Sequence, residues 1–243
     1  MSNLVVQSLW IGDSLSLLER LSISSFLKNG HEYHLYSYGP IQNVPSGTII
    51  KNAEEIIPSH KIFRYGAAAG QGKGSYSGFS NYFRFKLLHE RGGYWVDTDV
   101  VCLKFFDFEQ DYVFSSELWP EDKPSMTSSC LMKAPRNSEF THLCWAFCNT
   151  KDPNQLAWGE TGPDLVTRAI KVCNLAHLVK PFDTFCPITF FEMEKFIEPN
   201  PNIYLGNSYA IHFWNEEWRR RAYDKDTSYH PDSLYEKLKL QYL

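Results

Sequence analysis

The sequence predicts an α/β fold in which helices flank a mostly parallel central sheet. Residues 4–11 and 32–38 have the apolar patterning of strands, and residues 14–28 between them follow a helical period that ends at Asn29 and Gly30. This strand–helix–strand unit implies parallel pairing, with ligands at the carboxyl ends of the strands. A further apolar run at residues 94–96 leads directly into Asp97 and Asp99, so we expect functional side chains at that edge.

The remaining elements follow from the same patterns. Strands are predicted at residues 49–50, 94–96, 100–103, 112–116, 129–133 and 209–213, and helices at 79–91, 137–148, 162–173 and 231–240. Ser80 is expected near the N-cap of helix 79–91, which Gly92 and Gly93 end. The glycine-rich residues 66–78 predict either a plain connection or a lid near a ligand, and residues 181–201 predict irregular structure. No repeat or linker divides the chain, so we expect one domain over residues 1–243.

Composition excludes several classes of protein. Of the 243 residues, 43% are hydrophobic and 21% are charged, which is typical of a globular domain and argues against disorder. The formal net charge is −4, and the strongest basic cluster is the short run at residues 219–221. Bulk nucleic-acid binding needs a broad basic surface, so no nucleic-acid partner is expected. Aromatic residues make up 16% of the chain and suit either a core or stacking surfaces for bases and sugars.

The cysteines and the N-terminal residues predict a reduced, cytoplasmic protein. The cysteines are Cys102, Cys130, Cys144, Cys148, Cys173 and Cys186. Their spacing contains no C-x-x-C pair and no second ligand pair for a zinc site, so buried free thiols are expected. Residues 1–6 lack the features of a signal peptide, and no apolar run is long enough to span a bilayer. If the substrate is lipid-linked, we expect peripheral contact with the inner face of the membrane.

Asp97 and Asp99 have the chemistry of a metal site. Side chains alternate along a strand, so two carboxylates one residue apart point to the same side. Hard cations such as Mg²⁺ and Mn²⁺ prefer oxygen ligands and often bind one or two carboxylates together with substrate phosphates. A lone D-x-D is a weak signal, but its place after a buried strand favours a metal site.

The surrounding motifs resemble those of a known group of enzymes. S-N-Y-F-R at residues 80–84, followed by G-G-Y-W-V-D-T-D at 92–99, resembles the D-x-D signature of glycosyltransferases related to the family 32 mannosyl- and galactosyltransferases and to the clostridial glucosylating toxins. V-Q-S-L-W-I-G at 6–12, T-G-P at 161–163 and the pair His212 and Trp218 are similar to further motifs of that group. The resemblance implies a GT-A fold, a Rossmann-like nucleotide-binding sandwich.

The resemblance also implies roles for particular residues. Asp97, Asp99 and His212 would hold Mn²⁺ or Mg²⁺, and Asp97, Asp99 and Arg84 form the expected catalytic group. The expected donor contacts are Ser8, Trp10, Asn81, Arg84, Asp97, Thr98, Gly162 and Trp218. Asn81 stands where the family usually has Asp, which keeps an acceptor oxygen but removes the charge and puts the donor contact there in doubt. Four carboxylates near these motifs either bind substrate hydroxyls or are simply solvated: Glu160, Asp164, Glu216 and Glu217.

The implied function is the metal-dependent, retaining transfer of a hexose from a nucleotide-diphosphate sugar. A UDP-sugar is favoured as donor, and a saccharide or lipid-linked saccharide as acceptor, in the synthesis of a bacterial surface polysaccharide such as capsule or lipopolysaccharide. Two alternatives stay open on the sequence: a metal-dependent nucleotidyl or phosphoryl transferase, and a non-catalytic module that binds nucleotide sugars. The sequence leaves the oligomeric state open.

Overall fold

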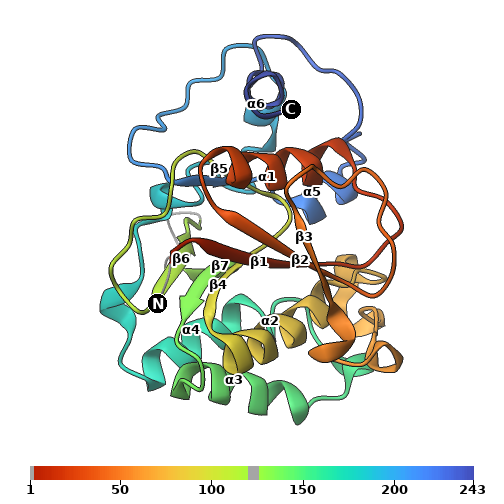
Figure 1. The fold of residues 1–243 in the computed structure, drawn as a ribbon, viewed down its shortest axis with the longest axis vertical. Coiled ribbons are helices and arrows are strands. Elements are labelled where there is room, and N and C mark those ends of the chain that lie inside the picture. Colours follow the sequence, from red (N-terminus) through yellow and green to blue (C-terminus); the bar gives the residue numbers. More distant parts are fainter. Residues whose placement is uncertain (1–2, 120–125) are drawn as a thin grey trace.

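The computed structural model describes residues 3–119 and 126–243, which are arranged around a six-stranded sheet (Figure 1). The strands of this sheet are β1 (Val5–Trp10), β2 (Glu32–Ser37), β3 (Ile49–Asn52), β4 (Gly93–Val96), β6 (Val113–Glu117) and β7 (Met126–Ala134). They lie in the order β3-β2-β1-β4-β7-β6. β1 pairs in parallel with β2 and β4, and β2 with β3, whereas β7 is antiparallel to both of its neighbours. The predicted α/β fold with a mostly parallel central sheet is confirmed.

Helices cover both faces of the sheet (Figure 1). They are α1 (Leu17–Lys28), α2 (Ser77–Arg91), α3 (Glu139–Asn149), α4 (Pro163–Val172), α5 (Asn215–Arg220) and α6 (Leu234–Tyr242). α1, α5 and α6 lie on one side, and α2, α3 and α4 on the other. Buried apolar side chains fill each layer; Phe83 and Leu87 of α2, for example, are fully buried. Burial of this kind is the main favourable contribution to folding.

A second, two-stranded sheet joins the C-terminal segment to the rest of the fold. It pairs β5 (Val100–Cys102) with β8 (Ala210–His212) in antiparallel register, so that Val100 lies opposite His212. Hydroxyl groups of α1 hold β5 in place: Ser22 Oγ donates to the Val100 carbonyl over 2.6 Å, and Ser25 Oγ accepts from the Cys102 amide over 2.7 Å. Residues 97–99 therefore connect the central sheet, through β4, to this second sheet.

Several predicted boundaries need correction. α2 begins at Ser77, with Tyr76 as its N-cap, so Ser80 lies inside the first turn of the helix and is not near the cap. α5 was not predicted, because its six residues are too few to show a helical period. Residues 181–201 form two short 3₁₀ turns, Phe182–Thr184 and Met193–Phe196, and are otherwise irregular, as predicted. None of the helices in residues 3–119 and 126–243 is both long and apolar enough to cross a membrane.

Gly92 ends α2 in a conformation that other residues avoid. Its φ is 68° and its ψ is −169°, and its amide donates to the Leu88 carbonyl. A Cβ atom at this position would lie 2.6 Å from the Arg136 backbone nitrogen. Gly92 therefore sets the tight turn that leads into β4 and the two aspartates beyond it.

We predict that Gly92→Ala lowers the free energy of unfolding by about 1–3 kcal/mol, because this backbone region is essentially restricted to glycine. Gly39→Ala is the matched control, since no heavy atom lies within 4 Å of its Cβ position. Urea denaturation of both variants measures the difference. Equal stability of the two would contradict a requirement for glycine at position 92.

Candidate active site

A cavity of about 900 Å³ opens at the carboxyl ends of the parallel strands. Trp10 ends β1, Asp97 follows β4 and Glu117 ends β6, and all three line it. Because β7 runs in the opposite direction, it contributes residues from its first half, among them Cys130. The last strand and the helix after it close another side with His212, Trp214 and Asn215. This is the edge at which the sequence predicted functional residues.

Asp97 is held rigidly by groups from three elements. Its amide donates to the Cys130 carbonyl of β7 over 2.7 Å. Its Oδ1 accepts a bond of 2.6 Å from Arg84 Nη2 and one of 2.7 Å from Trp95 Nε1. Burial raises the pKa of the Asp97 carboxyl to about 7, against the opposing effect of Arg84 and with a further increase from Asp99. This carboxyl therefore keeps its proton to a higher pH than an exposed aspartate does.

Arg84 connects Asp97 to Asn81 and, through Asn81, to the T-G-P motif at residues 161–163. The guanidinium is 3% exposed, and its Nη1 donates to Asn81 Oδ1 over 2.6 Å. Asn81 Nδ2 in turn donates to Thr161 Oγ1 over 3.4 Å. Gly162 packs against the same amide, since a Cβ there would lie 3.1 Å from Asn81 Nδ2. The asparagine thus keeps an accepting oxygen for Arg84, and the absence of a side chain at Gly162 leaves room for that amide.

Asp99 and His212 form the other half of the site. Asp99 Oδ2 accepts a bond of 2.7 Å from the Asn215 amide and lies 3.3 Å from His212 Nε2. Burial acts to raise the pKa of Asp99, but His212 and these hydrogen bonds outweigh it and lower the pKa. Burial likewise opposes a charged His212, yet the neighbouring Cys130 and Asp99 raise its pKa. The His212 imidazole is therefore easier to protonate than a free histidine, because Cys130 and Asp99 both lie beside it.

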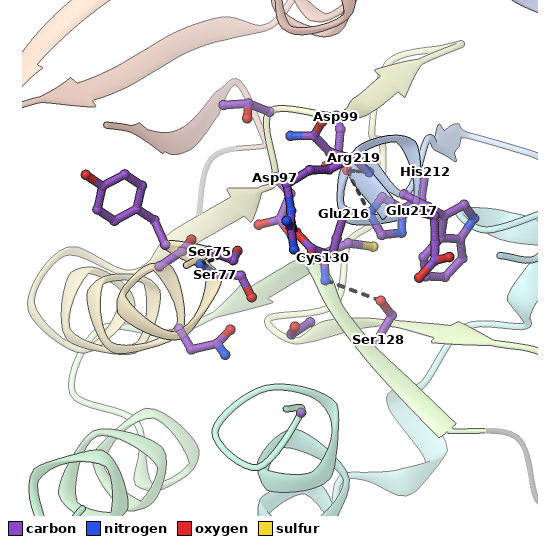
Figure 2. Close-up of a pocket in the computed structure, with 18 of the residues that line it drawn as sticks. Ser75, Ser77, Asp97, Asp99, Ser128, Cys130, His212, Glu216, Glu217 and Arg219 are labelled. Carbon is purple, nitrogen blue, oxygen red and sulfur yellow. Dashed lines mark hydrogen bonds and ion pairs between the residues drawn. The ribbon is translucent and has the colours of Figure 1, made fainter. Parts of the chain in front are cut away.

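Asp97, Asp99 and His212 fit a divalent cation. Their candidate ligand atoms all lie within 4.8 Å of one another. Figure 2 shows the three side chains around a common centre, with Ser75 and Ser77 on the far side of Asp97. Two carboxylates and one imidazole suit Mn²⁺ or Mg²⁺. A bound cation would replace the proton on His212 as the positive charge beside Asp99. The sequence separates the aspartates from His212 by more than a hundred residues, and pairing of β5 with β8 brings them together.

The predicted donor contacts fall into two groups. Trp10, Asn81, Arg84, Asp97 and Thr98 line the cavity. Trp10 is half-buried, and its Nε1 is a buried donor without a hydrogen-bond partner among the described residues, next to Gly12, where a Cβ would lie 3.1 Å from it. Gly162 lies directly behind this wall, against Asn81.

Ser8 and Trp218 have packing roles in the structure. Ser8 is fully buried inside the sheet, where its hydroxyl bonds to Tyr33 Oη over 2.7 Å and to the Val96 carbonyl. Ser8 therefore does not line the cavity, because its hydroxyl is hydrogen-bonded within the sheet. Trp218 belongs to the cavity wall, but its ring is fully buried against Tyr235 and other aromatic residues. Its contact with a donor stays a prediction.

The glycine-rich segment lies at the mouth of the cavity. Residues 74–77 line the cavity, and the neighbouring residues 67–72 form short 3₁₀ turns. Arg219 Nη2 donates to the Gln71 carbonyl over 2.8 Å, which ties this segment to α5. Of the four carboxylates noted in the sequence, Asp164, Glu216 and Glu217 line the cavity. Glu160 instead pairs with Lys151 over 2.7 Å.

Sequence reasoning missed one wall of the cavity. This wall contains Glu117, Trp119, Phe190 and Trp214. Glu117 is 5% exposed and accepts a bond of 2.9 Å from Trp119 Nε1. Burial raises its pKa to about 7, although that hydrogen bond acts in the opposite direction. No motif surrounds Glu117, so only its place at the end of a predicted strand indicated a role.

Comparisons with known proteins agree with the motifs. Residues 133–242 match the sequence model of a family described as the alpha 1,4-glycosyltransferase conserved region. The lactosylceramide 4-alpha-galactosyltransferases of Homo sapiens and Mus musculus are 26% identical over 149 residues and 28% identical over 150 residues. Each match covers 55% of this chain and only 40% of the relative. A solved structure, the PaToxG glycosyltransferase, is similar over 72% of this chain and 71% of its own, with 17% identity and a TM-score of 0.48.

The family match and the motifs cover different parts of the chain. The matched region contains Gly162, His212 and Trp218, whereas Asp97 and Asp99 precede it. The structure joins the two parts in one cavity. The resemblance predicted from the motifs is confirmed: this chain is similar to glycosyltransferases of the family 32 type, and its residues 133–242 match the conserved region of the alpha 1,4-glycosyltransferases.

Proposed function

We propose that this protein is a hexosyltransferase that uses a divalent cation and a UDP-sugar and delivers the sugar to a glycolipid or saccharide with retention of configuration. The observation that carries the proposal is the convergence of Asp97, Asp99 and His212 within 4.8 Å at one cavity. The alternative of a nucleotidyl or phosphoryl transferase has less support, because two-metal chemistry would need further carboxylates around the same centre.

Different residues of the cavity would bind the base, the diphosphate with its cation, and the sugars. Trp10 offers a ring at the end of β1 on which the nucleotide base stacks. Asp97, Asp99 and His212 would hold the cation, and a bound cation would neutralise charge on the departing diphosphate. Arg84 fixes the orientation of Asp97, and the carboxylates and aromatic rings of the opposite wall provide polar and stacking contacts for sugars.

The relatives indicate which acceptor to test first. The name of these galactosyltransferases describes galactosyl transfer to lactosylceramide. UDP-galactose and a lactose-ended acceptor are therefore the first pair to assay. Because the match covers less than half of these relatives, the activity is a proposal for this chain. The cytoplasmic location is a prediction from the sequence features described above, and the role in bacterial surface polysaccharides rests on the family resemblance alone.

We predict that the double variant Asp97→Asn, Asp99→Asn binds UDP in the presence of Mn²⁺ no better than the unaltered protein does with EDTA. Amides retain an oxygen but lose the charges that attract the cation. Isothermal titration calorimetry with UDP and with GDP, each with Mn²⁺ and with EDTA, measures this and also identifies the base. Asp232→Asn, an exposed change at the start of α6, is the control. Unchanged Mn²⁺-dependent binding in the double variant would disprove the assignment.

The affinity for Mn²⁺ is expected to fall as the pH is lowered from 8 to 6. The carboxyl of Asp97 has a pKa of about 7 without metal, so a proton competes with the cation below that pH. Each proton displaced from Asp97 or His212 contributes a loss of up to about tenfold per pH unit. Calorimetry at several pH values measures it, with Glu117→Gln as the control because Glu117 also has a pKa of about 7. A pH dependence that disappears in this control would assign the titration to Glu117.

Trp10→Ala is expected to weaken UDP binding by about 1–3 kcal/mol, the range observed when an aromatic ring under a nucleobase is removed. Trp145→Ala serves as the matched control, because Trp145 lies in α3 and packs against Tyr82. Both variants are titrated with UDP and Mn²⁺. If the two lose the same amount of affinity, the base does not stack on Trp10.

A further inference from the structure

Two cysteines lie beside the metal site although the proposed reaction does not use them. Cys130 of β7 and Cys186 are 2% and 0% exposed, and their Sγ atoms are 3.9 Å apart. The His212 amide donates to the Phe185 carbonyl over 3.0 Å, which brings Cys186 next to the histidine. Figure 2 shows the sulfur of Cys130 on the side of His212. One candidate ligand atom from each of Cys130, Cys186 and His212 lies within 4.8 Å of the others.

We propose that Cys130, Cys186 and His212 form a second metal site, specific for thiophilic cations of the Zn²⁺ and Cd²⁺ class, and that its occupation withdraws His212 from the site formed with Asp97 and Asp99. The proposal concerns a different ligand set from that of the proposed function and does not depend on transferase activity.

The geometry suits a tetrahedral ion. With Zn–S bonds of about 2.3 Å, two thiolates around a tetrahedral zinc lie about 3.8 Å apart. The observed separation is 3.9 Å, so binding requires little movement of either chain segment. Cys130, His212 and Asp99 line the cavity, which gives an ion a path of entry and an open fourth position, while Cys186 closes the site on the core side.

The proposed complex of one divalent cation with two thiolates has no net charge, so it can be buried at low cost. On binding, Cys130 and Cys186 form metal–sulfur bonds as thiolates, and His212 becomes neutral and donates a nitrogen lone pair. The protons that the two cysteines and the imidazole still hold are released to solvent. Two thiolates neutralise one divalent cation, so the complex has no net charge, which lowers the cost of placing it among buried apolar side chains such as Phe185 and Leu131. Thiolate sulfur also selects soft cations over Mn²⁺ and Mg²⁺.

Sharing of His212 makes the two sites compete. A neutral imidazole has one nitrogen lone pair for a metal, and its other nitrogen then carries a proton. His212 Nε2 faces Asp99, whereas Nδ1 is buried without a hydrogen-bond partner among the described residues. A soft cation bound by either nitrogen therefore deprives the aspartates of their third ligand, and we expect Zn²⁺ to weaken the binding of Mn²⁺.

The test titrates the reduced full-length chain with Cd²⁺ and follows the ultraviolet charge-transfer absorption of cadmium–thiolate bonds. We expect one equivalent to bind in the unaltered protein and in Cys148→Ala, which removes a buried cysteine of α3 that packs in a different part of the core from Cys130 and Cys186. Cys186→Ala should lose the absorption, and Cys186→Ser is the second variant if the first does not fold, with circular dichroism checking each. Absence of the band in the unaltered protein, or its persistence in the Cys186 variants, would overturn the proposal.

A second titration tests the shared histidine. Protein loaded with one equivalent of Zn²⁺ should bind Mn²⁺ at least about tenfold more weakly than metal-free protein, and Cys186→Ala should remove this effect. Equal Mn²⁺ affinity with and without Zn²⁺ would overturn the competition. Neither readout requires a donor or an acceptor, so failure of the proposed transferase activity would leave both results interpretable.

Discussion

The buried ion pair between Arg84 and Asp97 is the interaction on which the rest of the site depends. Arg84 is 3% exposed, so its charge needs a partner, and Asp97 lies 2.6 Å away at the end of β4. Removal of Asp97 would leave the buried guanidinium charge without this partner, which is costly because an uncompensated charge then remains inside the protein. The same guanidinium bonds to Asn81, and through it α2 is linked to Thr161 at the start of α4. One side chain thereby orients the metal-binding carboxylate and joins it to the wall formed by α2 and α4.

The site is arranged for a cation even in the ligand-free protein. Two buried acidic groups, Asp99 and Glu117, and the partly exposed Asp97 converge on one cavity, and desolvation alone would make each harder to ionise. Arg84 and a protonated His212 offset part of that charge. A divalent cation offsets more of it, so binding relieves an electrostatic cost already present in the folded chain. Such stored cost is typical of functional sites, where charge is placed for a ligand and not for stability.

His212 occupies the boundary between two ligand environments. On one side lie carboxylate oxygens, which prefer hard cations, and on the other lie the sulfurs of Cys130 and Cys186, which prefer soft ones. The strand pairing of β5 with β8 places the imidazole between them. The identity of the cation that reaches His212 thus decides which set of ligands it completes.

The sequence by itself determined the class of fold and half of the site. Periodicity predicted the opening strand–helix–strand unit and most later elements, because local patterns report which face of an element is buried. Asp97, Asp99 and Arg84 were found because their motif is local, lying within residues 80–99. The local patterns also placed Ser80 wrongly near the N-cap of α2 and did not predict α5. The ends of helices and the shortest helices depend on tertiary contacts, which a local pattern does not contain.

Only the tertiary structure decided what distant residues do together. Ser8 belongs to a family-like motif, yet its hydroxyl bonds inside the sheet, and Glu117 has no motif, yet it faces the cavity. Cysteine spacing showed no soft-metal site, because Cys130 and Cys186 are 56 residues apart in sequence and meet only when the segment before β8 packs against β7. Ligand sets built from separate strands have no signature in a linear pattern, since the sheet order that unites them is a property of the folded chain.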